Sequence, residues 1–159
     1  MREYLVTLLI AAALCYLITP LVRKYAIKFG AVAQVRTRDA HTTPTARWGG
    51  VAMWLAMTFT FLIVNHFSLV GKSFGREAQG IFLAATFIVL LGMADDRYEL
   101  DSLTKLAGQA LAAGILLLYG VQVLWIPANE VITLPASVGQ FLTVLIVLVT
   151  INAVNFIDG

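Results

Sequence analysis

The sequence predicts an all-α, polytopic membrane protein with five transmembrane helices and its N-terminus outside. The first observation is composition: 60% of the 159 residues are hydrophobic and 13% are charged, whereas soluble domains average about 45–50% and about 25%. The mean hydropathy is +0.86. The second observation is that the apolar residues form runs long enough to cross a bilayer, and the third is a basic connection after the first run. The lipid bilayer is therefore an expected partner, and nucleic acid is not.

Five apolar runs define the five expected helices. A helix needs about 20 residues, with a range of about 17–25, to cross the hydrocarbon core. Only helices can satisfy their backbone within such a run in lipid. The runs cover residues 4–22, 51–70, 78–94, 103–124 and 138–157. All five reach the required length, the third only just, and together they predict one transmembrane domain over residues 1–159.

The connection at residues 23–47 sets the orientation. It carries a single acid, Asp39, against six basic residues, which are Arg23, Lys24, Lys28, Arg36, Arg38 and Arg47. Loops rich in lysine and arginine remain in the cytoplasm. The stretch after the third run and the end of the fifth run then also lie at the cytoplasmic face, so the polar-rich segments share one side of a cell membrane.

The segment at residues 121–134 lies outside in this arrangement. It alternates loosely between apolar and polar residues and has a turn-like Pro-Ala-Asn-Glu at residues 127–130. This pattern is compatible with a short external hairpin.

An acidic stretch follows the third run directly and places four carboxylates within residues 95–101: Asp95, Asp96, Glu99 and Asp101. Carboxylates this close repel one another unless a cation or basic side chains share the space. Mg²⁺ takes oxygen ligands of this kind. The alternative is a solvated acidic loop. Within the stretch, Asp95 and Asp96 are the expected functional pair, while Glu99 is expected to be solvated.

The fourth run begins beside this stretch with a helix-capping signal and a lysine. Asp101 or Ser102 is a good N-cap, Lys105 lies in the first turns, and Gln109 is four residues further on the same face. A lysine near the membrane boundary commonly extends its ammonium group to the membrane surface. Beside aspartates and a phosphate, Lys105 would instead be a point-charge phosphate contact.

The fifth run ends in a polar face. Asn152, Asn155 and Asp158 recur every three residues, which places them along one side of a helix. Polar groups at a membrane exit are costly to bury, so they should face a polar cavity or one another. Hydrogen bonding between helices is the alternative role.

The basic connection ends in a further candidate site, His41 to Gly50. Its glycine pair lets the backbone approach a ligand, and His41, Thr45 and Arg47 could meet an anionic group. The alternative is a basic loop on anionic lipid, with Gly49-Gly50 allowing close helix packing.

These motifs, in this order, resemble the polyprenyl-phosphate N-acetylhexosamine-1-phosphate transferase family, which includes WecA and MraY. The matching patterns are His-x-x-Pro-x-x-Arg-x-Gly-Gly, Asp-Asp followed by Lys-x-x-x-Gln, and Asn-x-x-Asn-x-x-Asp-Gly. They begin at His41, Asp95 and Asn152. The ending Pro-Thr-Ala-Arg-Trp-Gly-Gly of the first loop is closer to the WecA type than to the MraY type. The overall run is most similar to versions that use decaprenyl phosphate.

The resemblance implies a reaction. Family members transfer a sugar-1-phosphate from a UDP-sugar to a polyprenyl phosphate, release UMP and form a lipid-linked diphosphate sugar. The first-loop ending favours N-acetylglucosamine-1-phosphate from UDP-GlcNAc as the transferred group, which would make the product the first lipid-linked intermediate of cell-wall or surface polysaccharide synthesis. Family members require Mg²⁺, with Mn²⁺ as an alternative. Members have ten or eleven spans, so the chain is expected to be an N-terminal half that is inactive alone. A homodimer and an MraY-like reaction with UDP-MurNAc-pentapeptide remain open.

The resemblance also implies roles for particular residues. The expected catalytic residues are Asp95, Asp96 and Asp158, and the expected metal ligands are Asp96, Asp158 and Asn155. The expected substrate-binding residues are Lys105, Asn152, Asn155, His41, Thr45 and Arg47. An ordinary aspartate, with a pKa near about 3.9, is a poor base for a phosphate whose second pKa is near about 6. Metal binding and positioning are therefore the preferred roles of the aspartate pair, and a general-base role remains open.

Two hypotheses from other classes compete with an enzyme. A small transport or ion-pathway protein could use the polar face of the fifth run as a cation route. The third and fourth runs are almost purely apolar in their middles, which argues against a pathway. A purely structural packing subunit leaves the four-carboxylate stretch unexplained.

Overall fold

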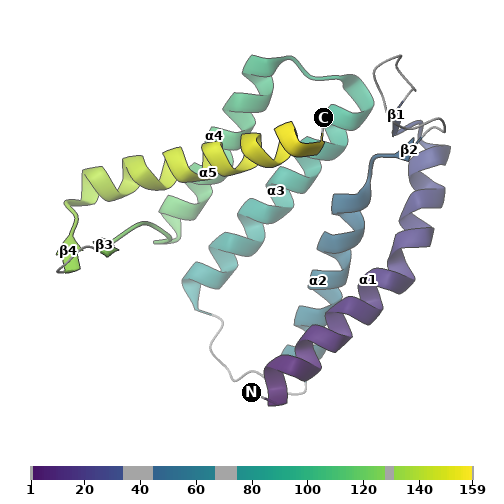
Figure 1. The fold of residues 1–159 in the computed structure, drawn as a ribbon, viewed down its shortest axis with the longest axis horizontal. Coiled ribbons are helices and arrows are strands. Elements are labelled where there is room, and N and C mark those ends of the chain that lie inside the picture. Colours follow the sequence, from purple (N-terminus) through teal and green to yellow (C-terminus); the bar gives the residue numbers. More distant parts are fainter. Residues whose placement is uncertain (1, 34–44, 67–74, 128–130, 159) are drawn as a thin grey trace. The chain divides into compact units, whose positions relative to one another are not determined.

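The computed structural model describes residues 2–33, 45–66, 75–127 and 131–158 (Figure 1). The described part is helical apart from two short strand pairs, which confirms the all-α prediction. The helices are α1 (Arg2–Lys28), α2 (Gly49–His66), α3 (Arg76–Tyr98), α4 (Ser102–Leu118) and α5 (Ala136–Asp158). The antiparallel pairs are β1 (Val32–Ala33) with β2 (Thr45–Ala46), and β3 (Trp125–Pro127) with β4 (Val131–Thr133).

Four of these helices, α1, α2, α3 and α5, are long and apolar enough to cross a membrane. The helix α4 is also apolar but has only 17 residues. At a rise of about 1.5 Å per residue, it lies at the lower limit for a span. Four of the five predicted spans are thus confirmed by length and composition, and a crossing by α4 remains a prediction.

The prediction that the fourth helix continues to residue 124 is wrong, and the reason is the glycine after it. Gly120 adopts a φ of +86°. The N–H of Val121 bonds to the carbonyl of Leu116 at 2.9 Å, and the N–H of Gly120 bonds to that of Leu117 at 3.0 Å. This pair of bonds is the Schellman motif, which closes a helix C-terminus. The remaining apolar residues lead into the β3–β4 strand pair, which confirms a hairpin here. Its external position remains a prediction.

Contacts divide the chain into two compact units. One comprises Met1–Ser73 with Gly92–Glu99, and the other comprises Phe74–Leu91 with Leu100–Gly159. In the first unit α1 and α2 run antiparallel side by side (Figure 1). The buried face of α2 recurs every four residues, and its members are Ala52, Ala56, Thr60 and Val64. Small residues at this spacing let two helices approach closely in a membrane.

In the second unit, α5 packs across α4 (Figure 1). The buried face of α4 is again made mostly of small residues, which are Gly108, Ala112 and Ala113 beside Gln109. A Cβ built on Gly108 would lie 2.6 Å from a methyl carbon of Leu91 on α3. The glycine therefore leaves room for the Leu91 side chain of α3 beside this turn of α4.

The end of α3 carries an unfavourable backbone conformation. Glu99 has a φ of +49°, and its N–H bonds to the carbonyl of Asp95 at 2.8 Å, which closes the helix. The left-handed region costs a residue with a Cβ about 1–2 kcal/mol and is readily adopted by glycine. We therefore expect Glu99→Gly to raise the free energy of unfolding by about 1 kcal/mol, measured by thermal or denaturant unfolding of the detergent-purified protein.

Glu99→Ala is the matched control for that substitution. It removes the same carboxylate but retains a Cβ at a positive φ. If alanine stabilises as much as glycine, the gain comes from the lost charge and the backbone argument is wrong.

Candidate functional site

The aspartate pair lies in the last turns of α3. The helix continues through Asp95 and Asp96 to Tyr98, four residues beyond the predicted end of the run. Both aspartates are partly buried, whereas Glu99 is exposed as predicted. Because the two residues are consecutive in a helix, their side chains leave the axis about 100° apart. The two carboxylates therefore lie on adjacent faces of the last turns of a helix, and not in a loop.

Asp101 is the N-cap of α4, as the sequence predicts. Its side chain accepts hydrogen bonds from the backbone N–H groups of Leu103 and Thr104, at 3.1 and 3.2 Å, and from the Thr104 hydroxyl. These bonds, first of all the one from that hydroxyl, hold the pKa of the exposed Asp101 carboxyl below its ordinary value. The Asp101 carboxylate thus caps the N-terminus of α4 by accepting hydrogen bonds from its first free N–H groups.

Lys105 and Gln109 occupy the first turns of α4, one helical turn apart. Lys105 is partly buried, and its backbone N–H bonds to the carbonyl of Asp101 at 3.1 Å. Gln109 is only 4% exposed. An amide buried this deeply needs hydrogen-bond partners, so its environment must supply at least one polar group.

That partner is Asn152 on α5. Its Nδ2 donates to Oε1 of Gln109 at 2.7 Å and to the carbonyl of Leu148 at 2.8 Å. The hydrogen bond between helices that the sequence left as an alternative is therefore present at Asn152. Asn155 is exposed. Asp158 is the last residue of α5, and its side chain lies outside the described part.

The sequence alone did not assign a role to Gln109, although its spacing from Lys105 was apparent. The signal that could have found it is a polar amide between Gly108 and the apolar stretch that follows. Such a residue in a buried helix requires a partner on another helix.

The first-loop candidates are only partly within the described residues. His41 lies outside them, and for Thr45 only the backbone is described, paired with Ala33 across β1 and β2. Arg47 is exposed, and its backbone N–H bonds to the carbonyl of Ala31 at 3.0 Å. The next residue, Trp48, stacks on the ring of Phe29, with the two ring centroids 5.9 Å apart. The strand pair and this stacking fix the backbone of Arg47 beside the end of α1.

The donor set for a metal ion is incomplete among the described side chains. No three histidine, cysteine, aspartate or glutamate residues gather there. Asp95 and Asp96 provide two carboxylates, which are donors that Mg²⁺ accepts, and Mg²⁺ commonly uses one or two carboxylates together with substrate phosphates and water. The chemistry of the residues thus fits Mg²⁺, and any further ligand would come from residues such as Asp158.

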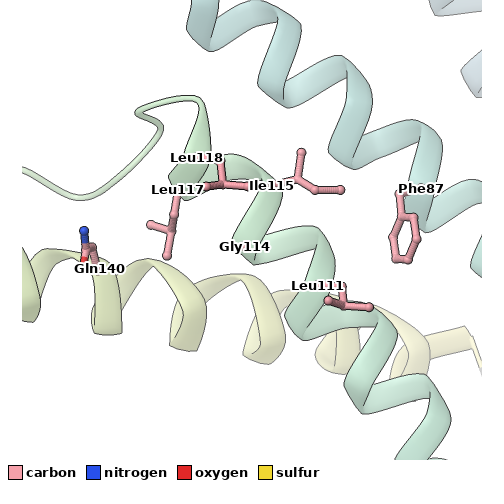
Figure 2. Close-up of a pocket in the computed structure, with 7 residues that line it drawn as sticks. All are labelled: Phe87, Leu111, Gly114, Ile115, Leu117, Leu118 and Gln140. Atoms are coloured by element: carbon pink, nitrogen blue, oxygen red, sulfur yellow. The ribbon is translucent and has the colours of Figure 1, made fainter.

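The second unit also contains an apolar cleft of about 620 Å³ between α3, α4 and α5 (Figure 2). It is lined by Phe87, Leu111, Gly114, Ile115, Leu117, Leu118 and Gln140. The cleft follows the C-terminal half of α4, away from Lys105 and Gln109 in its first turns. It offers one polar side chain, so it is no candidate for phosphate chemistry.

Long apolar helices with carboxylates, a lysine and amides near their ends define a protein of the multi-span membrane class. The chain belongs to glycosyl transferase family 4, whose family model matches residues 78–159, more than half of the chain. The match includes the aspartate pair, Lys105, Gln109 and the polar face of α5. No solved structure matches the chain.

Named relatives extend the similarity over the full chain. The decaprenyl-phosphate N-acetylglucosaminephosphotransferase of Mycolicibacterium smegmatis is 39% identical over 165 residues, which cover 100% of this chain and 41% of the relative. The enzyme of that name from Mycobacterium tuberculosis is 38% identical, with the same coverage. A probable undecaprenyl-phosphate N-acetylglucosaminyl 1-phosphate transferase of Bacillus subtilis is 27% identical, over 100% of this chain and 43% of its own length. The chain thus spans about two fifths of these relatives.

Proposed function

We propose that the full-length protein transfers N-acetylglucosamine-1-phosphate from UDP-GlcNAc to a polyprenyl phosphate, with decaprenyl phosphate as the favoured acceptor. The observation that carries this proposal is identity of 38–39% along the whole chain to relatives named for decaprenyl-phosphate N-acetylglucosamine phosphotransfer. The family match also contains every candidate residue on α3, α4 and α5.

The reaction exchanges one phosphoanhydride for another. An oxygen of the lipid phosphate attacks the phosphorus that carries the sugar, the bond from that phosphorus to the UMP oxygen breaks, and UMP leaves with the electron pair. A lipid-linked diphosphate sugar remains. The reacting groups are anions, so catalysis depends on positioning and on positive charge more than on covalent chemistry. Lys105 supplies one such charge as a phosphate contact.

Mg²⁺, when bound, would neutralise charge on the diphosphate and help to align the two phosphates. We assign its ligands as Asp96, Asp158 and Asn155. Asp95, the other aspartate of the pair, is assigned to catalysis together with Asp96 and Asp158. The other amide, Asn152, and the first-loop residues His41, Thr45 and Arg47 are assigned to substrate binding. A general-base role for either aspartate of the pair is not required, because the acceptor phosphate already carries negative charge at neutral pH.

The proposed orientation places these groups at the cytoplasmic face. The basic connection between α1 and α2 supports it, and it brings the ends of α3 and α5 and the start of α4 to one side of the membrane. This chain alone covers about 41% of the decaprenyl-specific relatives, so we expect it to be inactive without the rest of the protein.

Release of UMP tests the proposal. Full-length protein in detergent, supplied with UDP-GlcNAc, decaprenyl phosphate and Mg²⁺, is expected to release UMP and to form a lipid-linked product, and both should stop when EDTA is added. The 159-residue chain should release none under the same conditions. No turnover by the full-length protein, or preference for UDP-MurNAc-pentapeptide in competition, would contradict the assigned reaction. Robust turnover by the short chain would contradict the need for the remaining spans.

A further inference from the structure

The buried hydrogen bond between α4 and α5 determines which atom of Asn152 can meet a ligand. The carbonyl of Leu148 can only accept, so the atom of Asn152 that faces it must be the amide nitrogen. Both hydrogens of that nitrogen are then used, one by Leu148 and one by Oε1 of Gln109. Within the described part of the chain, no hydrogen bond engages Oδ1 of Asn152.

We infer that Gln109 is a positioning residue that makes Asn152 present its carbonyl oxygen, and not its N–H₂ group, to substrate. An amide that offers only an oxygen cannot bond a phosphate oxygen, which also accepts. It can meet a cation or an N–H or O–H group of the nucleotide. This inference rests on the proposed function, because it assigns Asn152 to the same substrate site.

Burial makes Gln109 suited to this task. Its side chain is 4% exposed, so water does not compete strongly for its Oε1, and leaving that oxygen or its partner unpaired is unfavourable. The neighbouring Gly108 and Ala112 are also buried on α4, so the face of α4 that carries Gln109 is shielded from water. Asn152 itself is only partly buried. Among the described residues, its Oδ1 is not one of the polar atoms that are buried without a partner, so the oxygen remains accessible while the nitrogen is held.

A length swap between the two amides tests the inference in the full-length protein. Gln109→Asn shortens one side chain by a methylene group and Asn152→Gln lengthens the other, so the double variant retains both amides and their combined reach. Each single variant is expected to raise the KM for UDP-GlcNAc, or the Mg²⁺ concentration at half-maximal rate, by about tenfold. The double variant should recover most of this loss.

The two readouts identify the ligand of Asn152. A change in the nucleotide KM alone indicates an N–H or O–H group of UDP-GlcNAc, and a change in the Mg²⁺ requirement alone indicates the cation. Both results support the inference. Gln140→Asn is the matched control, because it makes the same change to an exposed glutamine of α5, and it should leave both values unchanged.

Binding is also measured apart from turnover, as the rise in melting temperature that UDP-GlcNAc with Mg²⁺ produces. If the wild-type protein shows this rise but releases no UMP, the proposed reaction fails and the single variants still decide the inference. The inference is overturned if the wild-type protein shows no rise, if both single variants retain the wild-type rise and kinetic values, or if the double variant is no better than the worse single variant.

Discussion

Asp95→Asn, Asp96→Asn and Asp158→Asn should each abolish UMP release by the full-length protein while the protein still accumulates in the membrane. Asparagine retains the shape of aspartate and removes the negative charge, so it weakens cation binding with little effect on packing. Loss of a group that stabilises developing charge lowers turnover by about 10²–10³-fold. UMP release by each purified variant, measured over a range of Mg²⁺ concentrations, checks this expectation.

Asp101→Asn is the control for these three substitutions. It removes one charge from the same acidic stretch, but asparagine caps helices about as well as aspartate, and the side chain of Asp101 already serves the N-terminus of α4. It should therefore retain near wild-type turnover. If it is as inactive as Asp96→Asn, the general acidity of the stretch matters rather than the pair. If any of the three aspartate variants keeps a wild-type rate, its assigned role is wrong.

The parts of the fold that the sequence predicted depend on local chemistry. The cap at Asp101 needs only a short acceptor side chain before the first turn of α4, and the spans need only runs of apolar residues. The end of α4 was mispredicted because hydropathy continues past it to Leu124. Gly120 is itself a local signal, since a glycine after a helix is the usual left-handed C′ residue, and it should have outweighed hydropathy.

The parts that the sequence did not predict depend on which helix faces which. The bond between Gln109 and Asn152 joins residues 43 positions apart, and the spacing along each helix does not say that the two faces meet. The polar face at the end of α5 was predicted as a unit, yet Asn152 bonds to α4 while Asn155 is exposed. Polar periodicity identified candidate residues, and only tertiary packing distinguished their surroundings.

Close approach of two backbones is a further feature that the sequence did not predict, and it occurs at Gly139 in the first turns of α5. A Cβ built there would lie 2.3 Å from the backbone oxygen of Val123. The hydroxyl of Thr143 holds that segment in place, since it accepts from the N–H of Val123 at 2.9 Å and donates to the carbonyl of Gly139 at 2.7 Å. The segment cannot withdraw from an added methyl group without losing these bonds.

Gly139→Ala is accordingly expected to lower the free energy of unfolding by about 1–3 kcal/mol and to lower the melting temperature of the purified protein. Gly114→Ala is the matched control, because Gly114 is inside α4 and, apart from the adjacent backbone of that helix, no atom of the described residues lies within 4 Å of the position that its Cβ would take. Alanine there should stabilise the helix by about 0.5–1 kcal/mol. Opposite shifts of the melting temperature for the two variants would establish the close contact at Val123, whereas two equal shifts would show that this contact is absent.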